Sequence, residues 1–387
     1  MRICLYTETA LPMLGGQELV VDGLARQFLE LGHHPVVVAP PPRGSWWARD
    51  RSLPYQVVRQ PKFVSTRWFL DAYAWLLGRV QRRYRFDVVH CHSVYPTGYI
   101  AARSAALARL PLVITSHGGD VCPTSRLLKK PSLPARFACA LQHADALVAI
   151  SQFTAARFGE LCSQPTRIVA IPNGIDVAGL RAPAPRPPKL AKAIRPNEYF
   201  LFLGRVVARK GIGLLLDAWT DRQIAHHLVV AGDGPDLAAF REQTATRGLG
   251  DRVTFVGRAE GALKIHLLQN TLATVVPSRI SEGLPVVVLE SYAAGRPVIA
   301  TRVPGLEEIV EDNRTGLLVP ADSPAAFSDA LLWSTENRAR LAEMGQEAQR
   351  RADRYNWPTV AAEHLALYAE LIARKALGAN CEPDGKH

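Results

Sequence analysis

Two glutamates eight residues apart, Glu282 and Glu290, form the strongest chemical signal in the chain. Pro285 favours the first turn of a helix, so Glu282 should lie in the preceding loop and Glu290 within the helix. At about 1.5 Å per residue the two lie up to roughly 12 Å apart, so one could bind a sugar and the other a ribose, with a diphosphate at the helix N-terminus. The alternative is two solvated side chains. The loop residues predicted to bind such a nucleotide-linked sugar are Gly283, Leu284 and Pro285.

Arg205 and Lys210 flank a second turn, where a predicted strand passes into a helix. Two cations there can stabilise the negative charge that develops on a departing nucleoside diphosphate. The sequence contains no Asp-x-Asp motif, the usual carboxylate pair that holds a metal ion on a diphosphate. We therefore predict a site without metal ion or cofactor, in which Arg205 and Lys210 supply the positive charge. Arg209 is expected to be an exposed helix charge.

Two glycines and three histidines in the first half give weaker signals. Gly15 and Gly16 follow the first predicted strand, and glycines there let backbone N–H groups approach a phosphate, although any tight turn uses them too. His117 follows another strand and could hydrogen-bond the transferred sugar, or have a structural role. His90 and His92 would share one face of a strand, but two ligands without a third do not make a zinc site.

Alternating strand-like and helix-like segments position these residues and indicate an α/β fold of two βαβ domains with parallel sheets. The expected strands are 3–6, 35–39, 87–90, 112–116, 146–150 and 168–171, then 200–203, 227–231, 253–256, 273–276 and 298–301. Ligands of such domains bind at the carboxyl ends of the strands. The proline-rich segment 182–188 is predicted to link domains 1–181 and 189–359. A helical segment, 360–376, and a flexible polar tail, 379–387, should follow.

The first half carries most of the positive charge of the chain. The net charge is +11, and residues 1–180 hold 20 Lys and Arg against 11 Asp and Glu, whereas the remainder holds 26 against 24. Such an excess attracts anionic membranes, nucleic acid or a phosphorylated acceptor, or it is a scatter of solvated arginines. No nucleic-acid module is recognisable, and nucleic acid is not an expected partner.

Aromatic residues accompany the arginines of the first half. Trp46, Trp47 and Trp68 lie near a group of arginines in sequence, a mixture that suits a lipid interface, and we predict reversible association with anionic membranes. The arginines of this group are Arg79, Arg82, Arg83 and Arg85. No run is apolar enough to span a bilayer, and no signal peptide or disulfide pattern is visible. The expected location is cytoplasmic, and peripheral at the inner face of the membrane.

Seven motifs, in order along residues 1 to about 375, resemble those of retaining GT-B glycosyltransferases of family 4. Glu282 and Glu290 resemble its E-x7-E motif, and 204–211 is similar to its GR-x4-KG segment. The other matching segments are Gly15-Gly16, His117-Gly118, 171–176, 232–235 and 256–257. Leu284-Pro285 departs from the aromatic or glycine pair of many relatives, which affects loop shape.

The resemblance implies two Rossmann-like domains facing each other across a cleft, with the C-terminal helix crossing back to the first. It implies a UDP- or GDP-linked sugar donor and assigns Arg205 and Lys210 to the diphosphate, together with the backbone N–H of Gly16. Glu290 would bind the ribose hydroxyls, and Glu282 and His117 the sugar. The stretch 117–120 is most like members that make bacterial surface polysaccharides, so the expected acceptor is a lipid-linked or polysaccharide precursor. A sugar-nucleotide epimerase, a phosphorylase and a non-catalytic nucleotide-sugar-binding protein remain as alternatives.

Overall fold

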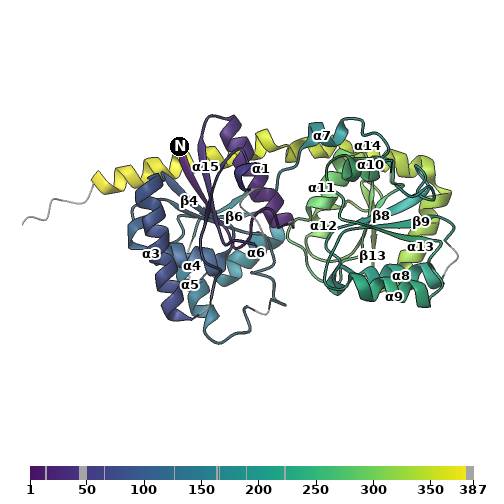
Figure 1. Ribbon diagram of the computed structural model, residues 1–387, viewed down its shortest axis with the longest axis horizontal. Helices are drawn as coiled ribbons and strands as arrows, with labels where there is room; N and C mark the ends of the chain where they lie inside the picture. Colours follow the sequence, from purple (N-terminus) through teal and green to yellow (C-terminus); the bar gives the residue numbers. More distant parts are fainter. Residues whose placement is uncertain are drawn as a thin grey trace, which may run out of the picture. The chain divides into compact units, whose positions relative to one another are not determined.

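The computed structural model describes residues 1–13, 15–42, 50–64, 66–125, 127–162, 164, 166–188, 190–221 and 224–380, with only the backbone of 67 and 378–380. Trp46, Trp47 and residues 381–387, for which we made predictions, lie outside this range. The chain forms two compact units, Met1–Gly174 with Trp357–His387, and Ile175–Asn356 (Figure 1). Each unit is a parallel sheet covered by helices, so the prediction of two Rossmann-like domains is confirmed.

The first unit contains a seven-stranded parallel sheet with the order β3-β2-β1-β4-β5-β6-β7. The strand order reverses between β1 and β4, which is where sheets of this kind bind ligands. The three strands β4, β5 and β6 are buried along their whole length, and β1 and β2 are buried at all but the first residue, as the apolar runs predict. The strands are β1 (Arg2–Tyr6), β2 (His34–Ala39), β3 (Gln56–Arg59), β4 (Val88–Cys91), β5 (Leu112–Ser116), β6 (Ala146–Ala149) and β7 (Ile168–Ala170).

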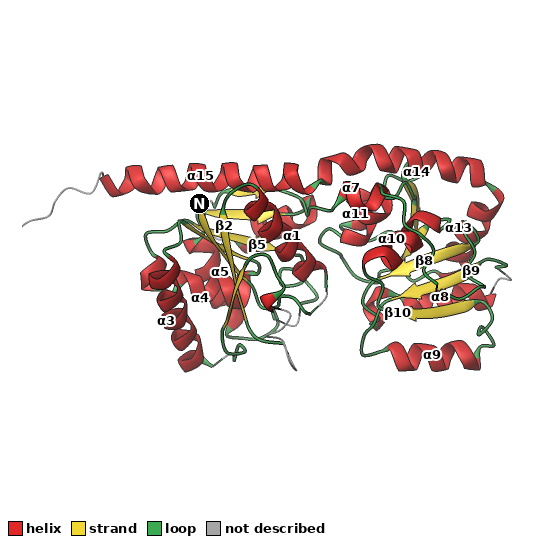
Figure 2. Ribbon diagram, turned by 45° about the horizontal axis from the view of Figure 1, so that its top comes forward, coloured by secondary structure: helices red, strands yellow, loops and turns green. Residues whose placement is uncertain are grey.

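Helices cover both faces of this sheet (Figures 1 and 2). One core contains residues of α3 (Arg67–Tyr84), α4 (Tyr99–Ala102) and α5 (Leu133–His143) against alternate residues of the strands. On the opposite face, Tyr368 of α15 (Trp357–Asn380) packs on Phe28 of α1 (Gly16–Glu30) and contacts His90 of β4. The remaining helices are α6 (Gln152–Leu161), the π-helical turn η1 (Val94–Gly98) and the 3₁₀ turn η2 (Ala105–Leu107).

The second unit contains a six-stranded parallel sheet with the order β10-β9-β8-β11-β12-β13. The order reverses between β8 and β11, so a second ligand-binding edge is expected there. The strands are β8 (Tyr199–Leu203), β9 (His227–Ala231), β10 (Val253–Gly257), β11 (Thr274–Val276), β12 (Val298–Thr301) and β13 (Gly316–Val319).

Helices also cover both faces of the second sheet. One core joins strand residues to α8 (Ile212–Asp221), α13 (Pro324–Glu336) and α14 (Arg338–Ala352). On the other face, Tyr199 of β8 donates a hydrogen bond to α10 (Gly261–Asn270), and Ser291 of α11 (Val286–Ala293) donates one to Thr274 of β11. The remaining helices are α7 (Val177–Arg181), α9 (Leu237–Thr246), α12 (Leu306–Ile309) and the 3₁₀ turns η3 (Ala208–Lys210) and η4 (Asp353–Tyr355). Among the described helices, none has the length and apolarity needed to cross a bilayer.

The chain passes between the units after Gly174 and after Asn356, and not within the predicted linker 182–188. Residues before and within that segment pack on the second unit, because the side-chain amide of Gln269 in α10 donates to the backbone oxygens of Leu180 at 2.9 Å and Ala182 at 2.8 Å. The C-terminal helix is longer than the predicted 360–376, so residues 379 and 380, expected in a flexible tail, belong to α15.

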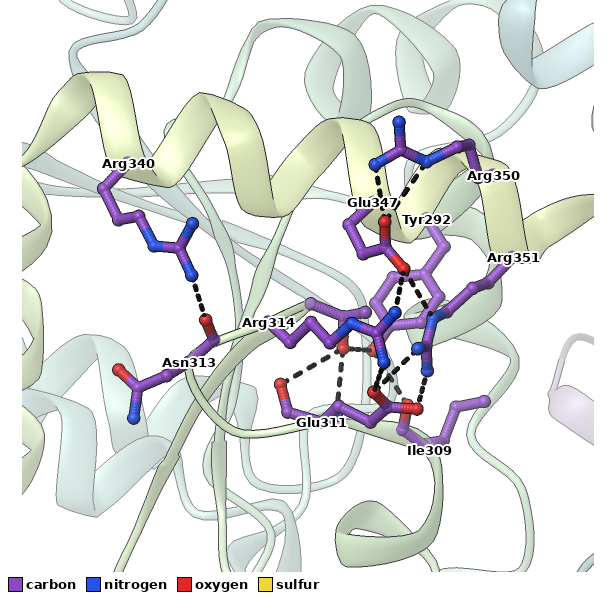
Figure 3. Close-up of polar contacts among 10 residues, drawn as sticks. Tyr292, Ile309, Glu311, Asn313, Arg314, Arg340, Glu347, Arg350 and Arg351 are labelled. Carbon is purple, nitrogen blue, oxygen red and sulfur yellow. Dashed lines mark hydrogen bonds and ion pairs between the residues drawn. The ribbon is translucent and has the colours of Figure 1, made fainter.

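Arginines and glutamates hold α14 against the turn that precedes β13 (Figure 3). Glu347 of α14 pairs with Arg350 at 2.5 Å and with Arg314 of the turn at 3.1 Å. Glu311, at the start of the turn, pairs with Arg314 at 3.1 Å and accepts from Arg351 of α14 at 2.7 Å. These contacts join segments of one unit, and each glutamate shares its charge with arginines, so we assign the network a structural role.

Candidate active site

The first part of the site follows β8 and contains Arg205 and Lys210. The turn packs closely, because a Cβ at Gly211, which has φ +78°, would lie 1.8 Å from the backbone oxygen of Pro277. Only glycine tolerates both that φ and that approach. The glycine therefore fixes Lys210, its neighbour in sequence, beside the loop that follows β11. Arg209 is exposed, as predicted.

Glu282 lies in that loop and contacts Lys210 directly. The Lys210 ammonium lies 2.7 Å from Glu282 Oε1, and the Ser278 hydroxyl donates to the same oxygen at 2.5 Å. The Glu282 side chain is only 11% exposed and that of Lys210 21%, so the ion pair is partly withdrawn from water. Both donors bind the same carboxylate oxygen, Oε1. The predicted proximity of the two motifs is therefore observed for this pair.

Backbone contacts explain why Glu282 is held firmly. Its N–H donates to the oxygen of Pro304 at 3.0 Å, and a Cβ at Gly305, with φ +86°, would lie 2.0 Å from the Glu282 oxygen. The loop is also joined to the Lys210 turn, since the N–H of Arg279 donates to the oxygen of Arg209 at 3.0 Å. Two separate loops are thus fastened at the point where the cation meets the carboxylate.

Glu290 occupies the predicted position within a helix and has a partner that the sequence did not reveal. It is 7% exposed in α11, and the Lys264 ammonium of α10 lies 2.6 Å from its Oε1. A buried carboxylate requires such compensation, because an unpaired charge at this depth is costly. Lys264 belongs to no recognisable motif, and the burial of Glu290, which would have indicated a nearby cation, was not predicted from the sequence.

Helix α11 begins at Val286, directly after the proline that was predicted in its first turn. Pro285 is the N-cap residue, and no side chain caps the helix. Gly283, Leu284 and Pro285 are buried, whereas Val286 and Val287, the first helical residues, are partly exposed. The backbone N–H groups at this end keep the partial positive charge of the helix.

Arg205, unlike Lys210, has no ionic contact among the residues that the structure describes. Its side chain is exposed, and no carboxylate among the described residues pairs with it. Its neighbours are fixed by backbone bonds, since the N–H groups of Gly204 and Val206 donate to Ala231 and Asp233 at 3.0 and 2.9 Å. The position of its backbone at the end of β8 is thus defined while its guanidinium remains available.

Gly15 and Gly16 form the start of α1 in the first unit, directly after the loop that follows β1. Gly15 is the N-cap residue and no side chain caps the helix. The carboxylate of Glu18, in the first turn, lies close by, since a Cβ at Gly15 would be 2.4 Å from its Oε2. An acidic group already interacts with the positive end of this helix.

His117 follows β5 and stacks on His92, which follows β4. The two rings are nearly parallel, at 13°, and His117 Nε2 lies 3.2 Å from His92 Nδ1. Burial, together with the smaller effect of the neighbouring His364, lowers the pKa of His117 to about 4. His117 is consequently a neutral ring at physiological pH, able to donate or accept a hydrogen bond but not to supply positive charge.

The histidines of β4 do not form a metal centre. His90 uses both ring nitrogens, at 2.6 Å from Tyr368 Oη and 2.7 Å from Thr115 Oγ1. His92 Nε2 is buried without a hydrogen-bond partner, and burial holds the pKa of both rings well below the ordinary value. Within the described residues no group of three His, Cys, Asp or Glu could hold a metal ion.

Sequence reasoning missed an acidic group at the edge where the first sheet reverses its order. Glu8 follows β1, and burial raises its pKa to about 7, with the Asp120 carboxylate adding to the effect and the Ser93 hydroxyl opposing it. Asp120 accepts from the Ser116 hydroxyl at 2.5 Å and from the Val94 N–H at 2.7 Å. A single glutamate after a strand belongs to no motif by which the sequence could identify it as a site residue.

Comparison with known proteins follows the two-unit division. Residues 14–178 match the family model Glycosyltransferase Family 4, and residues 190–351 match Glycosyl transferases group 1. The D-rhamnosyltransferase WbpZ of Pseudomonas aeruginosa is 32% identical over 271 residues, 68% of each chain. A GDP-mannose-dependent alpha-(1-6)-phosphatidylinositol monomannoside mannosyltransferase of Mycobacterium tuberculosis is 28% identical over 94% of this chain and 96% of its own.

The fold likeness extends to solved structures. The Anabaena protein HepE, solved in complex with UDP and glucose, superposes with a TM-score of 0.80 at 19% sequence identity, covering 96% of this chain and 100% of that one. At that identity the similarity concerns the fold, which is that of GT-B glycosyltransferases. The two family models and the identity to WbpZ show more: this chain belongs to glycosyltransferase family 4 and carries a group 1 glycosyl transferase domain.

Proposed function

We propose that this chain transfers a sugar from a UDP- or GDP-linked donor to an acceptor hydroxyl, with retention of the anomeric configuration and without a metal ion. The observation that carries the proposal is the contact of Lys210 with Glu282, 72 residues apart in sequence. This contact joins a diphosphate-binding cation to a sugar-binding carboxylate at the edge where β8 and β11 meet. Both parts of a donor would be bound there at once.

The contacts suggest a role for each residue of the second unit. An ammonium has three donors, so Lys210 can bind Glu282 with one and diphosphate oxygens with the others. Arg205 adds the charge of an exposed guanidinium, and the start of α11 at Gly283, Leu284 and Pro285 adds backbone N–H groups. Glu282 accepts from a sugar hydroxyl, and Glu290, held by Lys264, accepts from the ribose hydroxyls.

In the first unit the groups proposed to bind substrate are uncharged hydrogen-bonding groups. The neutral ring of His117 binds a sugar hydroxyl, and its stacking on His92 fixes the plane of the ring. Gly15 and Gly16 offer the backbone N–H groups at the start of α1 to a phosphate. Glu18 must then turn away from that helix end, because two anions cannot share it.

In the reaction the bond from the anomeric carbon to the donor phosphate breaks, and the diphosphate leaves with the electron pair. The acceptor oxygen forms its bond to the same face of the oxocarbenium-like sugar, and its proton passes to a donor phosphate oxygen. No protein nucleophile is required. The protein acts by placing the reactants and by stabilising the charge on the leaving group.

The relatives suggest the chemical class of both substrates. The mycobacterial relative is named for GDP-mannose and a phosphatidylinositol mannoside, and HepE was solved with UDP. We infer a lipid-linked or polysaccharide precursor as the acceptor, and an enzyme that acts at the cytoplasmic face of a membrane to build a cell-surface glycan.

A donor screen followed by variants tests the proposal. UDP- and GDP-sugars in large excess should raise the melting temperature, and the one that does so is then used for turnover. Lys210→Ala and Arg205→Ala should each lower kcat by about 10²–10³, the scale for loss of one preorganised donor. Arg209→Ala is the matched control, since that cation is exposed on the same turn and should leave kcat unchanged.

Three outcomes would contradict parts of this assignment. Near wild-type turnover in folded Lys210→Ala and Arg205→Ala would remove the electrostatic mechanism. Conversion of the nucleotide-sugar incubated alone would indicate an epimerase. Loss of turnover on chelation, with recovery on adding Mn²⁺, would refute metal independence. A separate measurement, proton NMR of the product, reports whether the anomeric configuration is retained.

A further inference from the structure

Helix α3 carries a stripe of aromatic and basic residues on its outer side. Its inner side is buried, with Leu70, Tyr73 and Leu77 each 2% exposed or less. The outward positions recur every three or four residues, the spacing of one helix face. They are Trp68, Ala72, Trp75, Arg79 and Arg82, all exposed. We call these five residues the α3 stripe. In both views the helix lies at the edge of its unit (Figures 1 and 2).

The aromatic end of the stripe is unusually exposed for side chains of this size. Trp68 is 88% exposed and Trp75 56%, and the adjacent Phe69 is 51% exposed. Tryptophan normally buries most of its ring, and a cluster of exposed large apolar groups marks an interaction surface. Among the described residues, four of the nine exposed large hydrophobic side chains lie between 64 and 75, the fourth being Val64.

The other end of the stripe is positively charged and uncompensated. Arg79, Arg82, Arg83 and Arg85 are exposed, and none pairs with a carboxylate among the described residues. Arg79 lies over the Trp75 ring, its Cζ 5.1 Å from the ring centre, so the two ends are continuous. The single acidic residue of the helix, Asp71, is already paired with Arg103 at 2.6 Å.

We propose that the α3 stripe is the surface by which this protein docks on a bilayer containing anionic lipids. Tryptophan rings prefer the headgroup level of a bilayer, and arginines beside them bind lipid phosphates. A second copy of the chain is a poorer occupant, because two such faces repel each other. This inference deepens the proposed function, since a lipid-linked acceptor lies in a membrane, but it concerns binding, which requires no turnover.

Vesicle co-sedimentation of the full chain tests the proposal. The protein should bind phosphatidylcholine vesicles that contain phosphatidylglycerol, should bind pure phosphatidylcholine far less, and should be released by high salt. Trp68→Ala with Trp75→Ala should weaken binding by at least about tenfold, and Arg79→Glu by about tenfold. All three side chains are exposed, so the variants should melt like the wild type.

Matched controls test whether vesicle binding depends on the α3 stripe itself, and not on any exposed apolar side chain or any positive charge. Leu377→Ala removes an apolar side chain that is 68% exposed on α15, and Lys192→Glu reverses an exposed cation of the second unit. Both should bind like the wild type. The proposal would be overturned if the double tryptophan variant bound like the wild type. It would also be overturned if the wild type bound equally to vesicles with and without phosphatidylglycerol. A wild-type dimer that Trp75→Ala converts to a monomer would likewise overturn it, because the stripe would then be a protein interface. Transfer to a soluble acceptor, measured in parallel, reports separately on the proposed function.

Discussion

Replacing Glu8 by glutamine should stabilise the first unit at alkaline pH and leave it unchanged in acid. Glu8 is largely enclosed at the end of β1, and burial beside Asp120 raises its pKa from 4.5 to about 7. A pKa difference of about 2.5 corresponds to about 3 kcal/mol, at about 1.36 kcal/mol for each unit. The folded state therefore holds this proton more tightly than the unfolded chain does.

The sign of the pH dependence follows from that difference. Because the unfolded chain loses the Glu8 proton first, the contribution of this group is most favourable below pH 4.5, falls as the pH rises to about 7, and is flat above. Glutamine keeps the shape and cannot ionise. At pH 8 Glu8→Gln should exceed the wild type by up to about 3 kcal/mol, and at pH 4 the two should agree.

Unfolding in urea is measured at several pH values and is monitored by hydrogen exchange of peptides from β1 and β4. These peptides report the free energy of unfolding of the first unit separately from that of the second. Glu363→Gln is the control, because it makes the same chemical change at an exposed position on α15. Its stability should follow the wild type at every pH. A Glu8→Gln difference that does not vary between pH 4 and pH 8, or a variant less stable than the wild type at pH 8, would refute the account of a buried, protonated carboxyl.

Two further predictions concern the second unit. Lys264→Met should lower the free energy of unfolding of the second unit by about 3–5 kcal/mol in urea at pH 7, because Glu290 would remain buried without its cation. An unchanged free energy of unfolding would mean that Glu290 reaches water. Gly211→Ala should cost at least about 1–3 kcal/mol and weaken donor binding measured by calorimetry, since its Cβ would meet the Pro277 oxygen; wild-type affinity would show that the Lys210 turn does not shape the site.

Mostly apolar runs were predictable as strands from sequence, and runs with polar ends or with a glycine were not. Runs such as 112–116 and 227–231 are mostly apolar, and the structure has strands with those bounds. β3 (Gln56–Arg59) was missed because it is an edge strand, half-exposed and ended by polar residues. β13 was missed as well, since its four residues include the glycine Gly316, which weakens a strand pattern.

Motif spacing predicted several residues of the candidate site. The residues that it did not predict, Lys264 and Glu8, depend on burial that the sequence does not reveal. Lys210 and Glu282 were placed at one sheet edge because both residues follow predicted strands that converge there, but their direct contact was not predicted. Lys264 was not foreseen, because a lysine within a helix signals a solvated charge until the depth of Glu290 is known. Glu8 was overlooked for the same reason, since sequence alone does not tell an enclosed carboxyl from an exposed one.

The lysine–glutamate pairs also give the cations of the second unit different roles. Lys210 already neutralises Glu282, so in the proposed reaction the pair would bring almost no net charge to a diphosphate and would act through the remaining N–H donors of the lysine. Arg205 is exposed and unpaired with any carboxylate of the described residues, so its full charge attracts a dianion. Salt weakens attraction between solvated charges more than a hydrogen bond within a partly buried pair. Arg205 should therefore govern capture of the donor in addition to its part in stabilising the leaving diphosphate, whereas Lys210 should act only on the diphosphate as it leaves.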